Sequence, residues 1–436
     1  MKKTSVSVGI IGLGTVGTGL AKILISKQKD LKKRLGFPLV IGRIADADIK
    51  KRNKIKLPGD IFVTDAGDVI NDPGIDIVVE LIGGIRPAKD YILMAIKKGK
   101  HVVTANKLLL ATEGSEIFRV ARENNRSVGF EAAVAGGIPV IKIFRESLIG
   151  NNIQAVYGII NGTSNYILTK MTEEGVTFSN ALKEAQVLGY AEADPALDVG
   201  GIDSAHKLAI LAALSFGVPF SIRKIYTEGI TDITPLDISF ASEFGYRIKL
   251  LAIAKQTGKE IELRVHPTML PEDHLMSNVN GVFNAVYIEG DAVGPALYYG
   301  KGAGEMPTGS AVISDIVDIA RDIATGAVNR IPGIGRPEDP FVRIKKMDDV
   351  QSSYYLRFSV LDRPGVLSRI SGILGAHNIS IKSVIQKGRK KEKVVPLVMM
   401  THQAREKDMA GALREINKLP IVSGKVTYIR VEGREE

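Results

Sequence analysis

The 436-residue chain contains no cysteine, and no stretch of it approaches the ~20 consecutive apolar residues that span a bilayer. Without cysteine, disulfide bonds, zinc–thiolate sites and thiol catalysis are excluded. This absence is also typical of a reducing cytoplasm, where we expect the protein to work without a membrane partner. The length predicts two to four domains, and the 45% apolar and 24% charged fractions are typical of a soluble globular protein.

The excess of basic residues lacks the pattern of a nucleic-acid binder. The net charge is +10, but lysines and arginines are scattered in short clusters at 27–33, 97–100 and 387–393. No tract interleaves aromatic with basic residues, as single-strand binders do. We therefore predict solvated basic faces and no nucleic-acid partner.

The first third of the chain carries a dinucleotide-binding pattern. A β-rich run at 6–11 is followed by GLGTVG at 12–17 and by a helical pattern to residue 25, the order that a Rossmann fingerprint requires. Gly12 allows a tight turn, Gly14 lets the backbone approach a pyrophosphate, and Gly17 lets helix and strand pack closely. We predict a Rossmann-like, doubly wound parallel sheet, with further strands at 39–45, 61–63, 75–82, 101–103 and 127–132.

Asp46 ends the second predicted strand, where a carboxylate can accept hydrogen bonds from ribose hydroxyls and repel a 2′-phosphate. It therefore favours NAD over NADP. Lys50, Lys51 and Arg52 lie close by in the sequence, so use of both cofactors stays open. A surface aspartate in a turn would give the same pattern.

From about residue 137 the pattern changes to α+β, which predicts a second domain. Strands are expected at 153–160, 261–265 and 282–288, and the first of them runs into NGTSN at 161–165. A glycine-rich loop at 299–310 opens a helix that reaches about residue 325. Crowded glycines are typical of a backbone that approaches a ligand, although a plain turn and helix N-cap would use the same residues.

The stretch from Gly189 to Lys207 concentrates charged side chains: Glu192, Asp194, Asp198, Asp203 and Lys207. Lys207 leads into the apolar run LAILAALSF, which predicts a buried helix. A lysine and an aspartate four residues apart usually form a modest surface pair. At the start of a buried helix such a pair is costly to desolvate, which favours a role in proton transfer at a substrate hydroxyl or carbonyl.

Residues 5 to 325 resemble homoserine dehydrogenase in six segments: GLGTVG, TANK at 104–107, FEAAVAGGIP at 130–139, NGTSNYI, GYAEADPALDVGGIDSAHK and GKGAGEMPTGSAV. The resemblance implies NAD(P)-dependent interconversion of L-homoserine and L-aspartate 4-semialdehyde, in the route toward threonine, methionine and isoleucine. Lys207 matches the family's acid/base lysine and Asp203 its partner carboxylate. Glu192, Asp198, Lys107 and Thr163 match substrate-binding positions.

The same resemblance supplies the remaining ligand positions. The cofactor-binding residues it implies are Gly12, Leu13, Gly14, Thr15, Val16, Gly17, Asp46, Thr104, Lys107, Gly302 and Gly304. It also implies a monovalent cation, Na⁺ or K⁺, on the backbone carbonyls of Glu131, Val134, Gly136 and Ile138. Hard cations favour such oxygen ligands. From the residues alone this loop is a glycine-rich turn between a strand and a helix.

The tail predicts a βαββαβ module after a linker rich in proline, glycine and charge. Its run DRPGVLSRISGILGAHNISI resembles the ACT domain, a ferredoxin-like amino-acid sensor. The resemblance implies an effector site near Asp362, Gly365, Asn378 and Ile379. We expect feedback inhibition by L-threonine, while a module that only joins subunits stays the alternative.

These inferences divide the chain into a cofactor-binding domain (1–136 with a returning helix at 307–330), a substrate-binding and dimerisation domain (137–306), a linker (331–352) and an ACT domain (353–431). The chain begins at the first Rossmann strand, so we expect a monofunctional enzyme. The family implies a homodimer or larger homo-oligomer. Two other readings stay open: a related amino-acid or semialdehyde dehydrogenase, because fold alone never determines the substrate, and a non-catalytic dinucleotide- and amino-acid-binding regulator.

Overall fold

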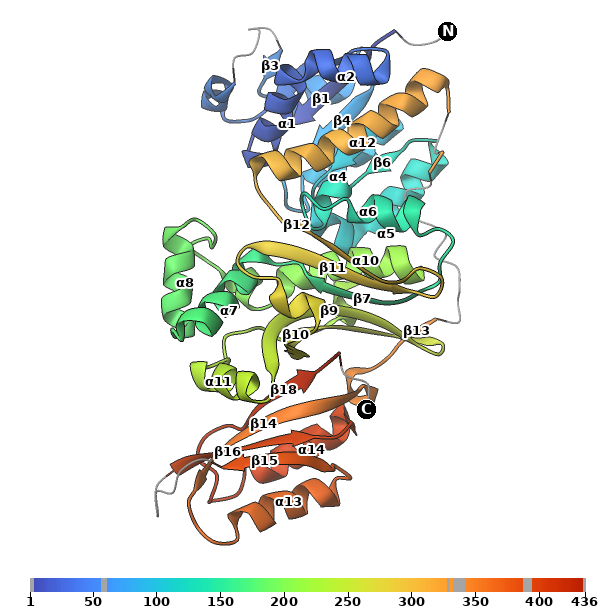
Figure 1. Ribbon diagram of the computed structural model, residues 1–436. Coiled ribbons are helices and arrows are strands. Elements are labelled where there is room, and N and C mark those ends of the chain that lie inside the picture. The colour runs from blue at the N-terminus through green and yellow to red at the C-terminus, as the bar shows by residue number, and fades with distance from the viewer. Residues whose placement is uncertain (1–3, 56–60, 328–329, 332–341, 387–393, 434–436) are drawn as a thin grey trace. The chain divides into compact units, whose positions relative to one another are not determined.

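The computed structural model describes residues 4–55, 61–327, 330–331, 342–386 and 394–433 (Figure 1). The chain divides into two compact units. The first combines Met1–Ile160, Ala205–Ile225 and Phe283–Phe341, and the second combines Asn161–Ser204, Tyr226–Val282 and Val342–Glu436. Among the described residues, no helix is both long enough and apolar enough to cross a membrane.

The first unit contains a six-stranded sheet with the order β3-β2-β1-β4-β5-β6. All its pairs are parallel, which confirms the predicted doubly wound sheet. The strands are β1 (Val6–Ile11), β2 (Leu39–Ala45), β3 (Phe62–Val63), β4 (Ile77–Glu80), β5 (His101–Thr104) and β6 (Val128–Gly129). Strand β6 is shorter than the expected 127–132, because the chain turns after Gly129 into the 3₁₀ helix Glu131–Ala133.

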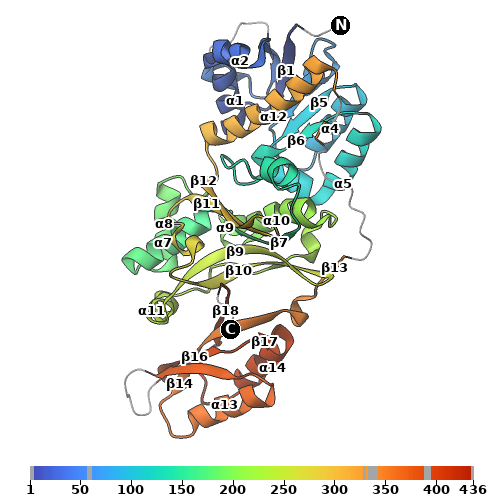
Figure 2. The same cartoon turned by 45° about the vertical axis from the view of Figure 1, so that its right-hand side comes forward.

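Strand β2 is followed by the 3₁₀ helix Ile49–Lys54, and five α-helices lie between the parallel strands in the sequence and cover the sheet. They are α1 (Thr15–Ser26), α2 (Gln28–Leu35), α3 (Ala66–Asn71), α4 (Ala88–Lys97) and α5 (Lys107–Glu123). Helix α12 (Glu305–Thr325) returns from late in the sequence and packs against α1, as Figure 2 shows. Apolar residues of α1, α12 and β1 form one core, so these two helices cover the same face of the sheet.

The first unit also holds an antiparallel set, β7 (Ile153–Ile159), β11 (Phe283–Gly290) and β12 (Gly294–Lys301), in which β11 pairs with both neighbours. The short helix α6 (Val140–Lys142) and the π-helix Ile143–Ser147 connect it to the cofactor sheet. Helix α10 (Ile202–Phe216) carries Lys207. Strand β12 was not predicted, because its sequence GPALYYGK lacks a clear alternation of apolar and polar residues.

The second unit is built on a hairpin of two twelve-residue strands, β9 (Tyr246–Thr257) and β10 (Glu260–Pro271), paired without a break. Both strands are buried on nearly every residue, so neither shows the alternation by which a half-buried strand is recognised. This is why β9 was missed and β10 was predicted too short. The hairpin is accompanied by α7 (Gly162–Glu174), α8 (Phe178–Val187), α9 (Ala196–Val199), β8 (Tyr226–Thr227) and α11 (Pro235–Glu243).

The C-terminal part of the second unit confirms the predicted βαββαβ module. Its elements are β14 (Gln351–Leu361), α13 (Val366–Ala376), β15 (Ile381–Gln386), β16 (Val394–Thr401), α14 (Glu406–Ile416) and β18 (Thr427–Val431), with the short β17 (Ala404–Arg405) before α14. The strand order is β18-β14-β16-β15 and every pair is antiparallel. Strand β18 also pairs in parallel with β10.

The predicted linker is described only in part. Residues 332–341 lie outside the described residues. Arg343–Ile344 form β13, which pairs with β10, and Met347–Asp349 form a 3₁₀ turn that leads into β14. The described end of the linker is thus attached to the sheet of the second unit.

Candidate active site

The glycine motif has the geometry of a phosphate loop. Gly12 has φ +102°, and a Cβ there would lie 2.7 Å from the carbonyl oxygen of Leu81. A Cβ on Gly17 would lie 2.0 Å from the carbonyl oxygen of Gly12, so neither position tolerates a side chain. A Cβ on Gly14 would meet no atom within 4 Å. The chain therefore leaves open space at Gly14, where α1 begins and its first backbone N–H groups have no partner in the helix.

Asp46 is bound to the glycine motif rather than free in a turn. One carboxylate oxygen accepts a 2.7 Å hydrogen bond from the backbone N–H of Leu13, and Lys51 Nζ lies 3.0 Å from each oxygen. Burial raises the pKa of Asp46, but the hydrogen bonds from Leu13 and Asp48 and the ammonium of Lys51 outweigh burial and hold the pKa below its ordinary value. An ionised carboxylate and an ammonium thus lie together at the end of β2.

The carboxyl ends of β4 and β5 are joined by a buried hydrogen bond, 2.7 Å from Thr104 Oγ1 to Glu80 Oε2. Glu80 also accepts from the backbone N–H groups of Ile82 and Gly83. Asn106 caps α5 by accepting from Leu109 N, which makes Lys107 the first helical residue at this edge of the sheet. The sequence predicts site roles for Thr104 and Lys107 but not for Glu80, whose signal is a lone carboxylate at the end of an apolar strand.

The two glycine loops of the first unit, 134–138 and 301–304, lie against each other. A Cβ on Gly136 would be 2.4 Å from the carbonyl oxygen of Gly302, and Gly137 N donates to the carbonyl of Lys301 at 2.9 Å. A Cβ on Gly302 would lie 2.0 Å from the Asn284 side chain, so Gly302 is required by packing. Gly304, at φ +123°, is the N-cap of α12. The loop predicted to hold a cation is therefore in contact with one predicted to hold the cofactor.

The carboxylate of Glu131 is already occupied by backbone donors. It accepts from Ile141 N at 2.8 Å and Lys142 N at 3.0 Å, while Glu131 N donates to Asp315. Burial, with the nearby Asp315 carboxylate, raises the pKa of Glu131 to about 8. Positive φ angles at Ala135 and Gly136 turn the following loop sharply. Such a loop fits a cation bound by carbonyl oxygens better than one bound by the Glu131 side chain.

In the second unit, one amide joins two of the predicted carboxylates. Asn161 Nδ2 donates to Asp198 at 2.7 Å and to Asp203 at 2.9 Å, and Asn161 Oδ1 caps α7 by accepting from Ser164 N. Asp203 is buried and Asp198 is half-buried. Sequence reasoning noted the NGTSN motif without assigning Asn161 a role, because asparagine at this position is equally typical of a helix N-cap.

Thr163 and Glu192, two further predicted substrate residues, lie at the neighbouring loop. Thr163 Oγ1 donates to the carbonyl of Tyr190 at 2.6 Å, two residues before Glu192. Glu192 is exposed, and its carbonyl accepts from Gln186. Thr163 and Glu192 are therefore associated through the loop that follows α8, whereas Asp198 and Asp203 are held by Asn161.

Lys207 is buried in the first unit, and its Nζ donates a 2.6 Å hydrogen bond to the carbonyl oxygen of Ile160. Ile160 directly precedes Asn161 in the chain. Asp203 and Lys207 lie four residues apart on α10, so helix geometry puts them on one face. The sequence prediction that α10 is apolar and that Lys207 is buried is confirmed.

The predicted effector residues lie at the two ends of α13. Asp362 and Gly365 precede this helix, with Gly365 in the left-handed region at φ +88°. Asn378 and Ile379 follow it. A helix of 11 residues is about 16 Å long, so the two pairs do not converge on one amino-acid-sized site within a single chain.

Comparisons with known proteins cover the whole chain. Residues 12–131 match the family described as the NAD binding domain of homoserine dehydrogenase, residues 139–317 match homoserine dehydrogenase, and residues 354–421 match the ACT domain. A homoserine dehydrogenase of Neisseria gonorrhoeae is 47% identical over 98% of this chain and 99% of its own length. The crystal structure of a homoserine dehydrogenase from Thiobacillus denitrificans superposes with a TM-score of 0.93, at 48% identity over 98% of both chains. A hyperthermophilic archaeal homoserine dehydrogenase in complex with NADPH is 29% identical, with a TM-score of 0.62 over 72% of this chain and 97% of that one.

Proposed function

The chain belongs to the homoserine dehydrogenase family and is an oxidoreductase with an NAD-binding domain, and from this premise we propose that Lys207 is its acid/base residue. In the reducing direction Lys207 Nζ gives a proton to the carbonyl oxygen of L-aspartate 4-semialdehyde, and in the oxidising direction it takes the hydroxyl proton of L-homoserine. The bound nicotinamide supplies or accepts the hydride. The 2.6 Å bond to Ile160 supports the proposal, because it holds Nζ at a defined position.

We assign Asp198 and Glu192 to the substrate's α-ammonium, and Asp203 to orienting Lys207. Anionic oxygens attract a cationic amine most strongly where water is partly excluded. The amide of Asn161 supports the assignment, because its single side-chain nitrogen donates one hydrogen bond to each aspartate. Thr163 and Lys107 complete the proposed substrate contacts.

The proposed cofactor contacts are the 12–17 loop, Asp46, Thr104, Lys107, Gly302 and Gly304. Asp46 favours NAD through the ribose hydroxyls. Lys51 lies 3.0 Å from it and offers a charge to a 2′-phosphate, which keeps NADP in the proposal. The archaeal relative's complex with NADPH agrees with this dual reading. A monovalent cation on the carbonyls of Glu131, Val134, Gly136 and Ile138 would hold the loop 134–138 against the loop 301–304.

We further propose that the ACT domain senses L-threonine as a feedback inhibitor of the pathway toward threonine, methionine and isoleucine. The distance along α13 between the two pairs of predicted effector residues supports a site shared by two copies of the domain, since each copy could supply one end. The proposal therefore includes a homodimer or larger homo-oligomer, with the subunits also joined through the substrate domain.

The first test is the initial rate of L-homoserine oxidation with NAD and with NADP, with and without L-threonine, in the presence of Na⁺ or K⁺. Lys207→Ala should lower kcat about 100-fold or more, as expected for loss of a general base. Its cofactor affinity, measured by fluorescence titration, should be unchanged. Full turnover in Lys207→Ala would refute the assigned role. If millimolar L-threonine alters neither the rate nor the melting temperature, threonine sensing is wrong.

The preference for NAD or NADP can be tested separately by replacing Lys51. Replacing Lys51 by alanine should raise KM for NADP about fivefold, equivalent to ~1 kcal/mol, and leave KM for NAD nearly unchanged. Lys50→Ala is the matched control, because Lys50 is exposed and its backbone N–H, not its ammonium, makes the local hydrogen bond to Asp48. Equal effects on the two cofactors would show that Lys51 does not contact the 2′-position.

A further inference from the structure

A buried arginine links the ACT domain to the substrate-binding part of the second unit. Arg430 lies on β18, the strand that pairs with β14 on one side and with β10 on the other. The residue is 1% exposed, which is unusual for a side chain that is always charged. The structural effect of this buried charge therefore depends on the groups that it binds.

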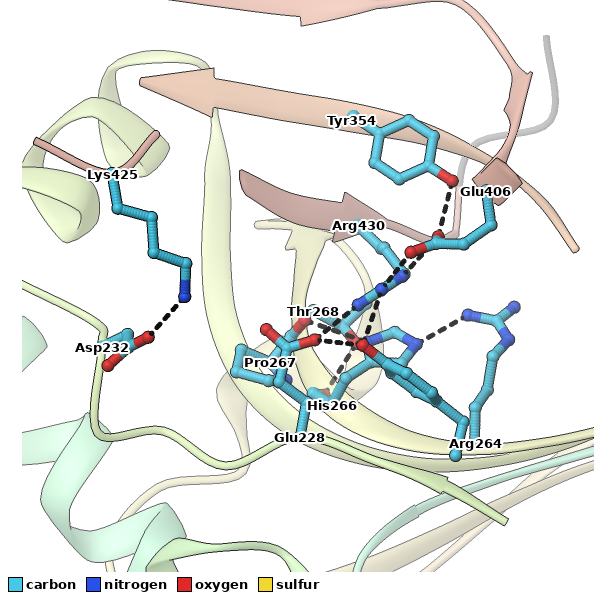
Figure 3. A network of polar contacts seen from close by, with 11 residues as sticks. Glu228, Asp232, Arg264, His266, Pro267, Thr268, Tyr354, Glu406, Lys425 and Arg430 are labelled. Atoms are coloured by element: carbon cyan, nitrogen blue, oxygen red, sulfur yellow. Dashed lines mark hydrogen bonds and ion pairs between the residues drawn. The ribbon is translucent and has the colours of Figure 1, made fainter. Parts of the chain in front are cut away.

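The guanidinium of Arg430 binds residues of both parts, as Figure 3 shows. On the ACT side it makes a two-pronged contact with Glu406, 2.9 Å from Nε to Oε2 and 2.5 Å from Nη2 to Oε1. On the substrate side Nη1 donates to Glu228 at 3.0 Å and Nη2 donates to the Tyr226 hydroxyl at 3.2 Å. Arg430 is thus shared between α14 of the ACT domain and the segment that begins at β8.

A second buried arginine lies near the first. Arg264 on β10 binds Glu262, Glu432 and His266, and all of its hydrogen-bonded groups are more than nine-tenths buried. Buried ion pairs cost free energy to desolvate and are seldom more stabilising than apolar packing. The two arginines therefore provide a fixed geometry more than they provide stability, which is the property that a joint between two domains requires.

The segment 226–230 connects Arg430 to the chain next to Asp198, one of the proposed substrate-binding carboxylates. Glu228 N donates to the carbonyl of Val265, and Ile230 N donates to the carbonyl of Val199, both at 2.8 Å. A Cβ on Gly229 would lie 2.3 Å from Val199 O, so the segment packs directly against the backbone at Val199, with no side chain of residue 229 between them. Val199 is the last residue of α9 and directly follows Asp198.

We infer that Arg430 is a positioning residue for the substrate site: through Glu228 it holds the segment 226–230 against the end of α9 and thereby sets where Asp198 meets the substrate's ammonium group. The ACT domain is then part of the apparatus that determines substrate affinity, even before any effector binds. This inference rests on the proposed role of Asp198. It assigns Arg430 and Glu228 no contact with substrate or cofactor.

The test is the kinetic behaviour of Glu228→Gln in the full chain. Glutamine keeps the size and the backbone hydrogen bond but removes the charge that Arg430 binds. We expect KM for L-homoserine to rise about fivefold or more, at the lower end of coupling between distant sites. Both kcat and KM for the cofactor should stay within about twofold, because Lys207 and the Rossmann loop belong to the other unit.

A matched control lies in the same two segments. Lys425, just before β18, and Asp232, just after Ile230, form a 3.4 Å ion pair whose side chains are 76% and 79% exposed (Figure 3). Asp232→Asn removes one charge at the same junction but leaves Arg430 untouched. It should not change KM for L-homoserine, since exposed pairs contribute little.

Three further outcomes separate the possibilities. If the wild-type protein does not oxidise L-homoserine, the proposed function fails and this inference fails with it. If the wild type is active but Glu228→Gln has the wild-type KM for L-homoserine, only the inference is overturned. If Glu228→Gln proves unstable by circular dichroism, Arg430→Lys decides instead: lysine keeps the charge but not the two-pronged contact, and an unchanged KM for L-homoserine in that variant also refutes the inference.

Discussion

The carboxylates of Asp198 and Asp203 depend on one side-chain amide. Two ionised carboxylates close together repel each other, and each is stabilised by a hydrogen-bond donor. Asn161 supplies both hydrogen bonds from a single nitrogen, so the separation of the two carboxylates is determined by the geometry of one amide. Asn161 also caps α7, which ties that geometry to the start of a helix.

We predict that Asn161→Ala raises KM for L-homoserine and lowers kcat together, because Asp198 and Asp203 both lose a donor. A loss of about 2 kcal/mol in kcat/KM is expected for two charge-assisted hydrogen bonds, measured by steady-state kinetics. Asn180→Ala is the control, since Asn180 is an exposed residue at the start of α8. Wild-type kcat/KM in Asn161→Ala would show that the carboxylates keep their positions without it.

Helices α1 and α12 cross in direct contact on one face of the six-stranded parallel sheet. A Cβ on Gly19 would lie 2.1 Å from the carbonyl oxygen of Glu305, and one on Gly309 would lie 2.9 Å from the carbonyl carbon of Gly19. The helix backbones therefore approach each other directly. This contact attaches a helix from residue 305 onward to the helix that begins in the phosphate loop.

We predict that Gly19→Ala destabilises the protein by about 1–3 kcal/mol through this overlap, despite alanine's better helix propensity. Thermal unfolding with and without NAD would measure the change. Gly372→Ala in α13 is the matched control, because no atom lies within 4 Å of the added Cβ. That variant should be equally stable or slightly more stable, and equal losses in both variants would contradict the packing argument.

Strand β9 is joined to its surroundings by a buried lysine. Lys249 Nζ donates to the carbonyl of Val279 at 2.6 Å and to Asn280 Oδ1 at 3.0 Å, and it lies 3.5 Å from Asn165 Oδ1 on α7. Burial, helped by the charge of Arg247, lowers the pKa of Lys249 to about 7. Protonation of Lys249 is therefore less favourable in the folded protein than in the unfolded chain.

The unfolded chain binds more protons than the folded protein between the folded pKa of about 7 and the ordinary lysine value near 10.5. Stability should therefore rise with pH across that window, by up to ~1.4 kcal/mol per pH unit from this group. We predict that Lys249→Met flattens this rise, measured as urea midpoints from pH 7 to 9.5. Lys259→Met, at an exposed turn residue, should keep the wild-type slope. A wild-type slope in Lys249→Met would refute the assignment.

Buried charged side chains join the ACT domain to the rest of the second unit in more than one place. One is the contact of Arg430 with Glu406 and Glu228. Another is Asp237 on α11, which is fully buried and accepts two hydrogen bonds from Arg357 and one from Tyr355 on β14. Both places join side chains that are more than 100 residues apart in the sequence, so these contacts form only in the folded unit.

We predict that Arg357→Ala costs about 3–5 kcal/mol, because it leaves the Asp237 carboxylate buried without its cation. Calorimetry should show the ACT domain unfolding at a lower temperature, ahead of the rest. Arg405→Ala breaks an exposed pair with Asp349, in which both side chains are 48% exposed, and should cost less than about 1 kcal/mol. A similar cost for both variants would argue against the buried joint.

The sequence by itself determined the parts that depend on local pattern. The order of strand, glycine motif and helix specified the parallel sheet, the apolar run after Lys207 specified a buried helix, and the tail pattern specified βαββαβ, because periodicity and turn residues act over a few neighbouring positions. Tertiary structure alone decided the β9–β10 hairpin, whose strands are buried on both faces and so show no alternation. It also decided the partners of Asn161, Glu80 and Arg430, because hydrogen bonds between residues 24 to 202 positions apart follow from the packed fold and leave no mark in a local stretch of sequence.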